Sequence, residues 1–241
     1  MSAAEKAWQG VMARVARAAS AAGRNPATVG ILAVSKTFPP EAIRAVHGAG
    51  ARMFGENYVQ EALGKMDVLK ALTDVEWHLI GPLQGNKARL AADRFAWVHT
   101  IDRLKIAERL SAARSEAAPP LNVCIQVNVS GEISKSGLPA GEAVALAPAV
   151  AALPRLSLRG FMAIAEATDD VARQRAQFRI ARECLDAARA GGLDLDTLSM
   201  GMSDDLESAI AEGATLVRIG SAIFGPRSPA PRSSTADLQQ A

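Results

Sequence analysis

A lysine follows the first strongly apolar stretch of this sequence, where a charged side chain is least expected. Residues 29–35 read VGILAVS, a pattern typical of a buried strand, and Lys36 comes directly after them. Lysine is seldom buried, so a solvated residue at a strand end is the ordinary interpretation of this position taken alone. A lysine that is partly removed from water has a lowered pKa and can attack an aldehyde as a free amine. This is the chemistry that Lys36 could carry out.

Two glycine- and serine-containing motifs near the C-terminus could bind a phosphate. The motif MGMSDD contains Gly201 and Ser203 and leads into a helical stretch, and RIGSAIFG contains Gly220 and Ser221. Glycine lets a phosphate approach the main chain, and a helix N-terminus presents N–H groups to an anion. Each motif alone is equally compatible with an ordinary helix cap. Together, on neighbouring strands, they favour a phosphate site.

The elements that must position these residues alternate along the chain as strand and helix. The candidate strands are 29–35, 52–55, 76–81, 96–100, 122–129, 157–164, 197–201 and 215–220. The helical stretches between them are 40–48, 57–71, 86–93, 103–117, 139–152, 170–190 and 204–212. Eight such units in series predict an α/β fold of the (β/α)8 TIM-barrel type, with a doubly wound sheet as the main alternative. Residues 2–22 are predicted to form an extra N-terminal helix, because Ser2 and Glu5 have capping-box spacing.

A barrel brings the lysine and the phosphate motifs together, because its eighth strand pairs with its first. A lysine beside a phosphate cradle is what a pyridoxal 5'-phosphate (PLP) site requires, since the lysine forms an imine with the aldehyde and the cradle anchors the phosphate. Arg218 lies two residues before Gly220, so strand alternation places both on the same face. Its permanent charge would leave a facing pyridine nitrogen unprotonated and weaken the ring as an electron sink. An ion pair with Glu56 or Asp205 is an alternative role for Arg218 and is compatible with the first.

The remaining histidines and carboxylates suggest no further chemistry. His47, His78 and His99 have no carboxylate or cysteine at a supporting spacing, so structural or polar roles are preferred to a zinc site. Asp204 and Asp205 are adjacent, and we expect both in the first turn of a helix, where they complement its dipole. We therefore predict no metal site and no carboxylate acid–base pair.

Composition excludes several other classes of function. The 27 lysines and arginines nearly balance 25 acidic residues, which argues against a nucleic-acid or membrane partner. Cys124 and Cys184 form no C-x-x-C pair, and the start of the chain does not resemble a signal peptide, so we expect a reduced, cytoplasmic protein. Residues 1–226 are predicted to form a single barrel domain, and 227–241, rich in proline and serine, a disordered tail. Lys135 lies in a glycine- and serine-rich loop that is a candidate lid, with a solvated loop as the default.

Eight ordered motifs closely resemble the pyridoxal phosphate homeostasis protein family (the YggS/PROSC type). They are AVSKTFP, FGENYVQE, WHLIGPLQGNK, IDR, QVNVSGEISKSG, LRGFMAI, LSMGMSDDLESAI and VRIGSAIFG, and they cover roughly residues 29 to 225. The resemblance implies a fold-type III PLP barrel, related to the barrel domain of alanine racemase, with the cofactor held as an imine on Lys36. It further implies that the phosphate is held by Ser203, Gly220 and Ser221, that Arg218 faces the pyridine nitrogen, and that Asn57 lines the ring.

Two positions depart from the family pattern. Ser221 stands where threonine is common, and because the hydroxyl is kept, the phosphate role is expected to remain. Phe38 stands where lysine is common, and we expect this change to alter the rim of the site rather than its chemistry.

The resemblance implies intracellular PLP (vitamin B6) homeostasis, with PLP-dependent apo-enzymes as candidate recipients and no established catalytic activity. The alternative is a PLP-dependent amino-acid racemase or lyase, and a phosphate-sugar barrel enzyme without cofactor is a third hypothesis. Alanine racemases use a second base, a tyrosine from an additional domain of a partner subunit. This chain contains one tyrosine, Tyr58, and is expected to end after the barrel, so two-base racemisation is poorly supported and a monomer is expected.

Overall fold

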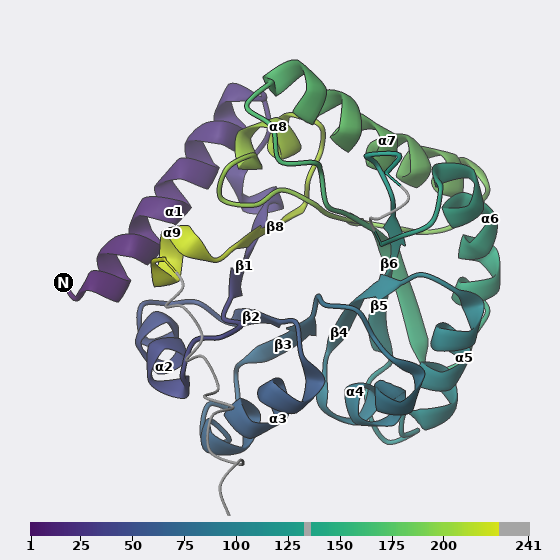
Figure 1. Ribbon diagram of the computed structural model, residues 1–241, viewed down its shortest axis with the longest axis horizontal. Helices are drawn as coiled ribbons and strands as arrows, with labels where there is room; N and C mark the ends of the chain where they lie inside the picture. Colours follow the sequence, from purple (N-terminus) through teal and green to yellow (C-terminus); the bar gives the residue numbers. More distant parts are fainter. Residues whose placement is uncertain (133–135, 227–241) are drawn as a thin grey trace, which may run out of the picture.

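The computed structural model describes residues 1–132 and 136–226, and within them eight parallel strands close into one barrel in chain order (Figure 1). The strands are β1 (Gly30–Val34), β2 (Met53–Glu56), β3 (Glu76–Leu79), β4 (Trp97–Ile101), β5 (Leu121–Val127), β6 (Leu156–Ala163), β7 (Thr197–Ser199) and β8 (Leu216–Ile219). Strand β8 pairs with β1 in a register that places Arg218 opposite Leu32. The predicted TIM barrel is confirmed, and the predicted strands differ from the observed ones only at their ends.

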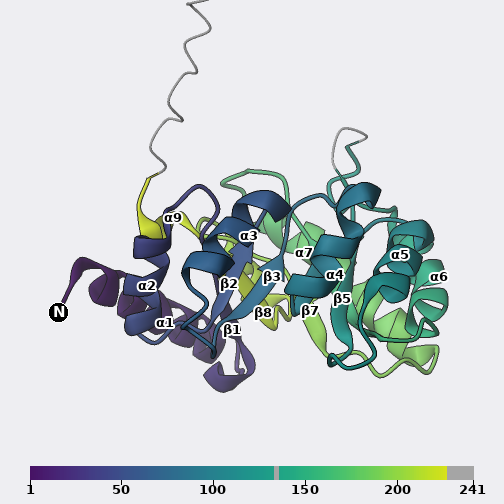
Figure 2. The same cartoon turned by 90° about the horizontal axis from the view of Figure 1, so that it is seen from below.

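Helices surround the barrel on its outer side (Figures 1 and 2). They are α1 (Ala3–Ala21), α2 (Pro40–Gly48), α3 (Val59–Val68), α4 (Ala88–Arg94), α5 (Leu104–Ala113), α6 (Ala140–Ala151), α7 (Val171–Ala190), α8 (Leu206–Ala211) and α9 (Ser221–Phe224). Short 3-10 helices, η1 (Pro26–Thr28) and η2 (Gly85–Lys87), precede β1 and α4. The predicted N-terminal helix is confirmed as α1, with the Ser2–Glu5 capping box formed, and it packs against α2, α8 and α9.

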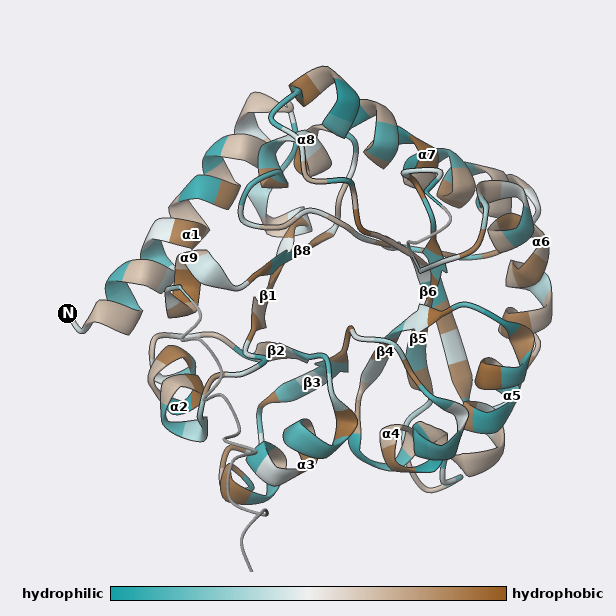
Figure 3. Ribbon diagram, viewed as in Figure 1, coloured by the Kyte–Doolittle hydropathy of each residue, from teal (hydrophilic) through white to brown (hydrophobic). Residues whose placement is uncertain are grey.

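Strand alternation separates two environments. Residues such as Ala33, Val217 and Ile219 face outward and join the main hydrophobic core between the strands and the helices. Hydrophobic and hydrophilic segments alternate along the outer helices, as expected for helices with one buried face (Figure 3). The inward side chains include a small cluster of Trp97, Cys124 and Met162 and several buried polar groups. TIM-barrel interiors are usually filled by branched aliphatic residues, so this polar content needs a separate explanation.

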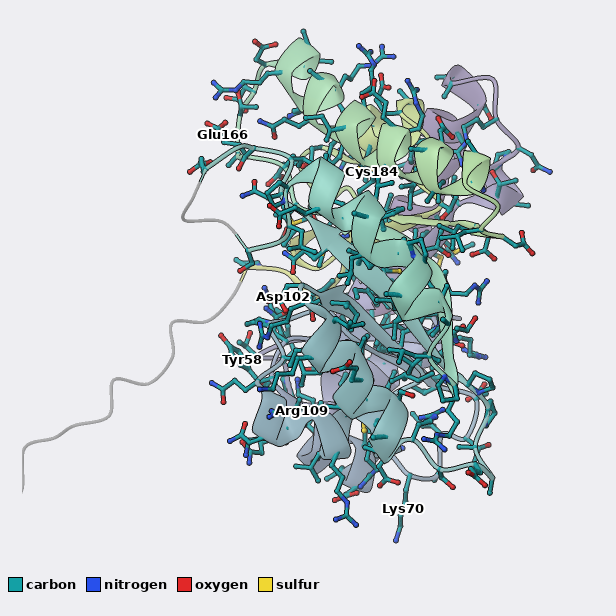
Figure 4. All side chains as sticks on the ribbon, turned by 90° about the vertical axis from the view of Figure 1, so that its right-hand side faces the viewer. Tyr58, Lys70, Asp102, Arg109, Glu166 and Cys184 are labelled. Atoms are coloured by element: carbon teal, nitrogen blue, oxygen red, sulfur yellow. The ribbon has the colours of Figure 1, made fainter. Side chains whose placement is uncertain are left out.

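The carboxyl ends of the strands meet at one edge of the molecule. Tyr58, Asp102 and Glu166, which follow β2, β4 and β6, lie along the same edge in Figure 4. No described helix has both the length and the apolar character needed to span a membrane. The predicted tail at 227–241 and Lys135, the candidate lid residue, lie outside the described residues.

Candidate functional site

A cavity of about 260 Å³ opens at the carboxyl ends of the strands. All six residues predicted from the sequence line it: Lys36, Asn57, Ser203, Arg218, Gly220 and Ser221. Val34, Ile80 and Ile164 supply an apolar wall. The volume is just below the roughly 300–1,000 Å³ of typical small-molecule pockets, so the cavity suits a small, partly polar ligand.

Lys36 reaches this cavity because of the alternation along β1. Val34 also lines the cavity, and Lys36 is the next residue on the same face, while Ser35 between them is fully buried on the opposite face. Lys36 itself is half-buried. The residue that follows, Thr37, has a positive φ of 69°, a left-handed conformation that is uncommon for any residue except glycine. The chain therefore turns sharply immediately after the lysine.

The loops after β7 and β8 bring two hydroxyl groups together at the cavity. Oγ of Ser221 lies 3.1 Å from Oγ of Ser203. Among the described residues, no protein acceptor is found for the backbone N–H groups of Ser203, Asp204 and Ser221, which all line the cavity. Hydroxyls and unbonded N–H groups at one place form a site that an anion would complete.

The N-terminal helix supports this pair of loops. Nη1 of Arg14 donates a hydrogen bond of 2.6 Å to the carbonyl oxygen of Ser203, and Nε and Nη2 of Arg14 contact the carboxylate of Glu207 at 2.6 and 2.7 Å. Helix α1 thus fixes the loop after β7 as well as covering α8 and α9. Sequence reasoning did not find this role, because nothing in the α1 sequence distinguishes Arg14 from its other arginine neighbours.

Arg218 lies inside the barrel, directly below the cavity, with 4% of its surface exposed. Its Nη1 donates to the carbonyl oxygen and to Oγ of Ser199, the latter at 2.9 Å, and its Nη2 donates to the carbonyl oxygen of Ala163 at 2.8 Å. These contacts use three of its five N–H groups and leave others for the cavity side. Burial lowers the pKa of the guanidinium to about 10, so it remains charged at neutral pH.

The ion pair between Arg218 and Glu56, offered above as an alternative role for Arg218, is wrong. Glu56 faces outward from β2, where its carboxylate accepts hydrogen bonds from Lys65 at 2.8 and 3.0 Å and from Ser35 at 2.6 Å. Strand alternation explains the error, since Glu56 and Arg218 lie on opposite faces of the barrel wall. Asp205, the other proposed partner, favours the charged form of Arg218 electrostatically, but no ion pair between them within 4.0 Å occurs in the described part of the chain.

The expected placement of Asp204 and Asp205 in the first helical turn is also wrong. Helix α8 begins at Leu206, so Asp205 occupies its N-cap position and Asp204 precedes it. The carboxylate of Asp205 accepts a hydrogen bond from the backbone N–H of Met202 instead of from the helix. It therefore closes the turn that carries Ser203, which is a loop-forming role rather than a dipole effect.

A hydrogen-bonded chain crosses the barrel interior from Arg218 to the opposite end of the barrel. Nδ1 of His99 lies 2.8 Å from Oγ of Ser199, Nε2 of His99 lies 2.9 Å from Nδ1 of His78, and Nε2 of His78 lies 2.9 Å from the carboxylate of Glu76. Both imidazoles are completely buried, and burial lowers the pKa of His78 and lowers that of His99 well below its ordinary value. Both histidines are therefore neutral at pH 7.

Neutral histidines give this chain a single direction. The carboxylate of Glu76 can only accept, so Nε2 of His78 donates to it and Nδ1 of His78 accepts from His99. Nδ1 of His99 then accepts from Ser199, whose oxygen accepts from Arg218. The chain satisfies the buried polar groups of the interior and fixes Arg218 at its upper end. The sequence placed His78 and His99 on consecutive strands without showing that they touch.

One aromatic contact and one backbone contact shape the rim of the cavity. Phe38 lines the cavity and stacks on Phe224 of α9, with ring centroids 5.0 Å apart. The backbone of Asn57 packs closely against Gly81 in the loop after β3, so closely that a Cβ atom added to Gly81 would lie only 2.2 Å from the carbonyl oxygen of Asn57. Phe38 is thus on the rim, where the sequence predicted its effect, and Asn57 is positioned by backbone packing.

Comparison with known proteins assigns the chain to a family. Residues 10–228 match the family model of the alanine racemase N-terminal domain. The chain is 61% identical over 217 residues to the pyridoxal phosphate homeostasis protein of Pseudomonas aeruginosa, a match that covers 90% of this chain and 93% of that protein. The chain belongs to the pyridoxal phosphate homeostasis protein family. The family member of Escherichia coli K12 is 52% identical over 221 residues, which cover 89% of this chain and 92% of that protein.

Solved structures agree with this family assignment. PipY of Synechococcus elongatus PCC7942, determined with PLP bound, is 39% identical with a TM-score of 0.77, and the match covers 88% of this chain and all of that one. Alanine racemase of Corynebacterium glutamicum is 20% identical with a TM-score of 0.69, and the match covers 91% of this chain and 62% of the racemase chain. The second likeness concerns the fold alone.

Proposed function

We propose that this protein binds pyridoxal 5'-phosphate in the cavity at the carboxyl ends of the strands, with Lys36 as its covalent partner, and takes part in PLP homeostasis. The observation that carries the proposal is the meeting of Lys36, Arg218 and the paired hydroxyls of Ser203 and Ser221 around one cavity. The membership in the homeostasis family and the PLP bound to PipY support it.

The residues present fit this cofactor. The backbone N–H groups and hydroxyls of Ser203 and Ser221 match a phosphate, and at the other side of the cavity Arg218 offers N–H groups to a ring nitrogen. Gly220 contributes space, because a Cβ atom there would meet the protein only at 3.5 Å or more, at Val34. Protein packing therefore does not require a glycine at this position, and its effect is to keep the cavity open.

Each group would have a separate task. PLP, when bound, supplies an aldehyde that an amine can capture. Lys36 would present its Nζ to that aldehyde, and the loops after β7 and β8 would hold the phosphate and so orient the ring. Asn57 and Arg218 would line the ring, with Arg218 donating a hydrogen bond to its nitrogen. No observation in the structure favours a racemase or lyase over a protein that holds the cofactor.

We extend the proposal to organisation and setting. Residues 1–226 form one PLP-binding domain that acts as a monomer in the cytoplasm, and PLP-dependent apo-enzymes are its candidate recipients. The near balance of charges argues against nucleic acid or an acidic membrane as a partner.

The absorbance spectrum of the purified protein with PLP tests the proposal. We expect a visible band from covalently bound cofactor, and borohydride should abolish the band and leave a stable mass increase on the peptide that contains Lys36. Lys36→Ala should show neither effect. Lys105→Ala is the matched control, because Lys105 is an exposed lysine on α5 that does not line the cavity. This variant measures the unspecific reaction of PLP with surface amines.

Three results would contradict the proposal. A full visible band in Lys36→Ala would remove Lys36 from its role, and a wild-type protein that stays colourless with PLP would remove the cofactor. Rapid incorporation of solvent deuterium at the α-carbon of an amino acid would replace storage of the cofactor with catalytic turnover.

A further inference from the structure

A buried charged cluster lies behind Lys36, on the outer face of the barrel wall. The side chains of Glu56 and Lys65 are 0% and 7% exposed, and their charged ends are 2.8 Å apart. Nζ of Lys65 also donates a hydrogen bond of 2.8 Å to the carbonyl oxygen of Ser35, whose hydroxyl donates to Glu56 at 2.6 Å. The hydroxyl and the carbonyl oxygen of the residue before Lys36 are therefore both bound to this ion pair, while its backbone N–H donates to Gly55 in the neighbouring strand.

The same cluster also holds the residue after Lys36. Glu61, on the first turn of α3, accepts a hydrogen bond of 2.7 Å from the backbone N–H of Thr37 and pairs with Lys65 at 2.6 Å. Thr37 is in the left-handed region, with φ of 69°, a conformation that costs free energy and persists only where its surroundings impose it. Two contacts hold this turn: the backbone N–H of Phe38 donates a hydrogen bond of 3.1 Å to the carbonyl oxygen of Ser35, and the Glu61 carboxylate holds the N–H of Thr37 itself.

Stability alone does not explain why such a cluster is buried. Removing charges from water is costly, and replacing a buried ion pair by apolar residues of similar size is often neutral or stabilising. Burial even raises the pKa of Glu56 despite Lys65 beside it, which shows that desolvation outweighs the attraction there. What the cluster gives in return is geometry: three side chains of β2 and α3 fix the backbone on both sides of one residue.

We propose that Glu56, Lys65 and Glu61 are positioning residues for Lys36. By holding Ser35 and the strained peptide of Thr37, they aim the Lys36 side chain from the end of β1 into the cavity, toward the hydroxyls of Ser203 and Ser221. None of the three touches the cavity itself. The inference rests on the proposed function, because it assigns these residues to the capture of an aldehyde by Lys36.

Two ligands separate positioning of the lysine from general damage to the site. Pyridoxal 5'-phosphate reports on the cradle and the lysine together, whereas pyridoxine 5'-phosphate carries an alcohol in place of the aldehyde and reports on the cradle alone. In Glu61→Ala and in the charge-neutral pair Glu56→Gln with Lys65→Met, we expect covalent capture of PLP to slow by about tenfold to a hundredfold. The Kd of pyridoxine 5'-phosphate should stay within about twofold of wild type, since no contact to the cradle changes.

The rate of capture is followed by stopped-flow absorbance, with borohydride trapping at timed intervals to count modified Lys36. Glu61→Ala protects the test against misfolding, because the Glu61 side chain is 31% exposed and its loss leaves the buried pair intact. Glu212→Gln is the matched control: Glu212 is 1% exposed and pairs with three arginines of α7, so it alters another buried carboxylate network outside the cavity. It should change neither the capture rate nor the Kd.

The outcomes divide clearly. Capture of PLP at the wild-type rate in both Glu61→Ala and the Glu56→Gln, Lys65→Met pair would overturn the inference. An equal loss of the PLP capture rate and of the affinity for pyridoxine 5'-phosphate would also overturn it, because the cluster would then maintain the whole site. Slow capture with unchanged binding of pyridoxine 5'-phosphate supports it. Failure of the proposed function is recognised separately, because wild-type protein would then capture no PLP at all.

Discussion

His78 and His99 are buried side by side inside the barrel, and we expect them to make folding stability fall as the pH falls below about 6.5. Both are neutral in the folded protein, because burial lowers their pKa values, and Arg218 further opposes protonation of His99. Glu76 favours protonation of His78 only partly. In the unfolded chain the histidines have ordinary pKa values near 6.5, so below this pH the unfolded chain binds more protons than the folded chain. Acid therefore favours unfolding.

The size of the effect follows from the linkage between proton binding and folding. Lowering the pH from 7.5 to 5.5 costs about 1.4 kcal/mol for one histidine that stays neutral when folded, and at most roughly 2.7 kcal/mol for two. We expect the full amount from His99, whose pKa is well below the ordinary value, and a smaller part from His78. For a domain of this size the loss corresponds to roughly 3–10 °C in Tm.

Urea unfolding of the cofactor-free protein at several pH values measures this effect. The readout is the change in unfolding free energy between pH 7.5 and 5.5, compared between wild type and the double variant His78→Gln with His99→Gln. The substitutions cost stability at every pH, so only the slope is informative. Glu56 and Asp205 have raised pKa values and contribute a slope of opposite sign, but this contribution is common to both proteins and cancels. Parallel curves for the two proteins would refute the neutral, directional chain.

Three further predictions concern the loops after β7 and β8, which we propose to hold the phosphate. Gly220→Ala should keep the wild-type free energy of unfolding in urea, because the added Cβ would meet only ordinary contacts. The same variant should weaken the binding of pyridoxine 5'-phosphate by about tenfold or more. Unchanged binding would show that the ligand does not approach Gly220. Gly201→Ala should lower the free energy of unfolding by about 1–3 kcal/mol, since φ at this position is +92° and the added Cβ would lie 2.5 Å from Cβ of Ala209. A variant as stable as wild type would contradict this geometry. Arg14→Ala should weaken binding of inorganic phosphate by loosening Ser203, at a cost in stability of about 1 kcal/mol because the Arg14 ion pair is partly exposed. Arg17→Ala is the control, because exposed Arg17 on the same helix acts on Glu207 only through its charge, and it should leave phosphate binding unchanged. Equal phosphate affinity in both variants would remove α1 from the site.

The part of the site that could be predicted from sequence is the part set by one strand at a time. The alternation along β1 and β8 places Lys36, Arg218 and Gly220 on one face, and closure of the barrel makes these strands neighbours. Both facts follow from a period of two and from the eightfold succession of strands and helices. These three lining residues could therefore be predicted without any knowledge of side-chain contacts.

The supporting contacts could not be predicted, because they depend on register and on helix placement. Glu61 and Lys65 have the i, i+4 spacing of an ordinary exposed helix pair, and only the packing of α3 on β2 shows that Lys65 is buried against Glu56. The contact between His78 and His99 depends in the same way on how β3 and β4 align. Sequence spacing is unable to distinguish a solvated pair from a buried one in either case.

Arg218 also bears on why this site would hold a cofactor rather than turn over a substrate. Burial lowers the pKa of the guanidinium to about 10, which is still well above neutrality, so Arg218 stays charged at pH 7. A ring nitrogen facing such a cation stays unprotonated, and an unprotonated ring withdraws electrons from a bound substrate poorly. The chain of hydrogen bonds below Arg218 strengthens this state, because its acceptors run from Ser199 to the carboxylate of Glu76 and orient every donor away from the cavity. The polar interior of the barrel thus supports the site, since its acceptors hold the guanidinium in place below the cavity and offset part of the cost of burying its charge.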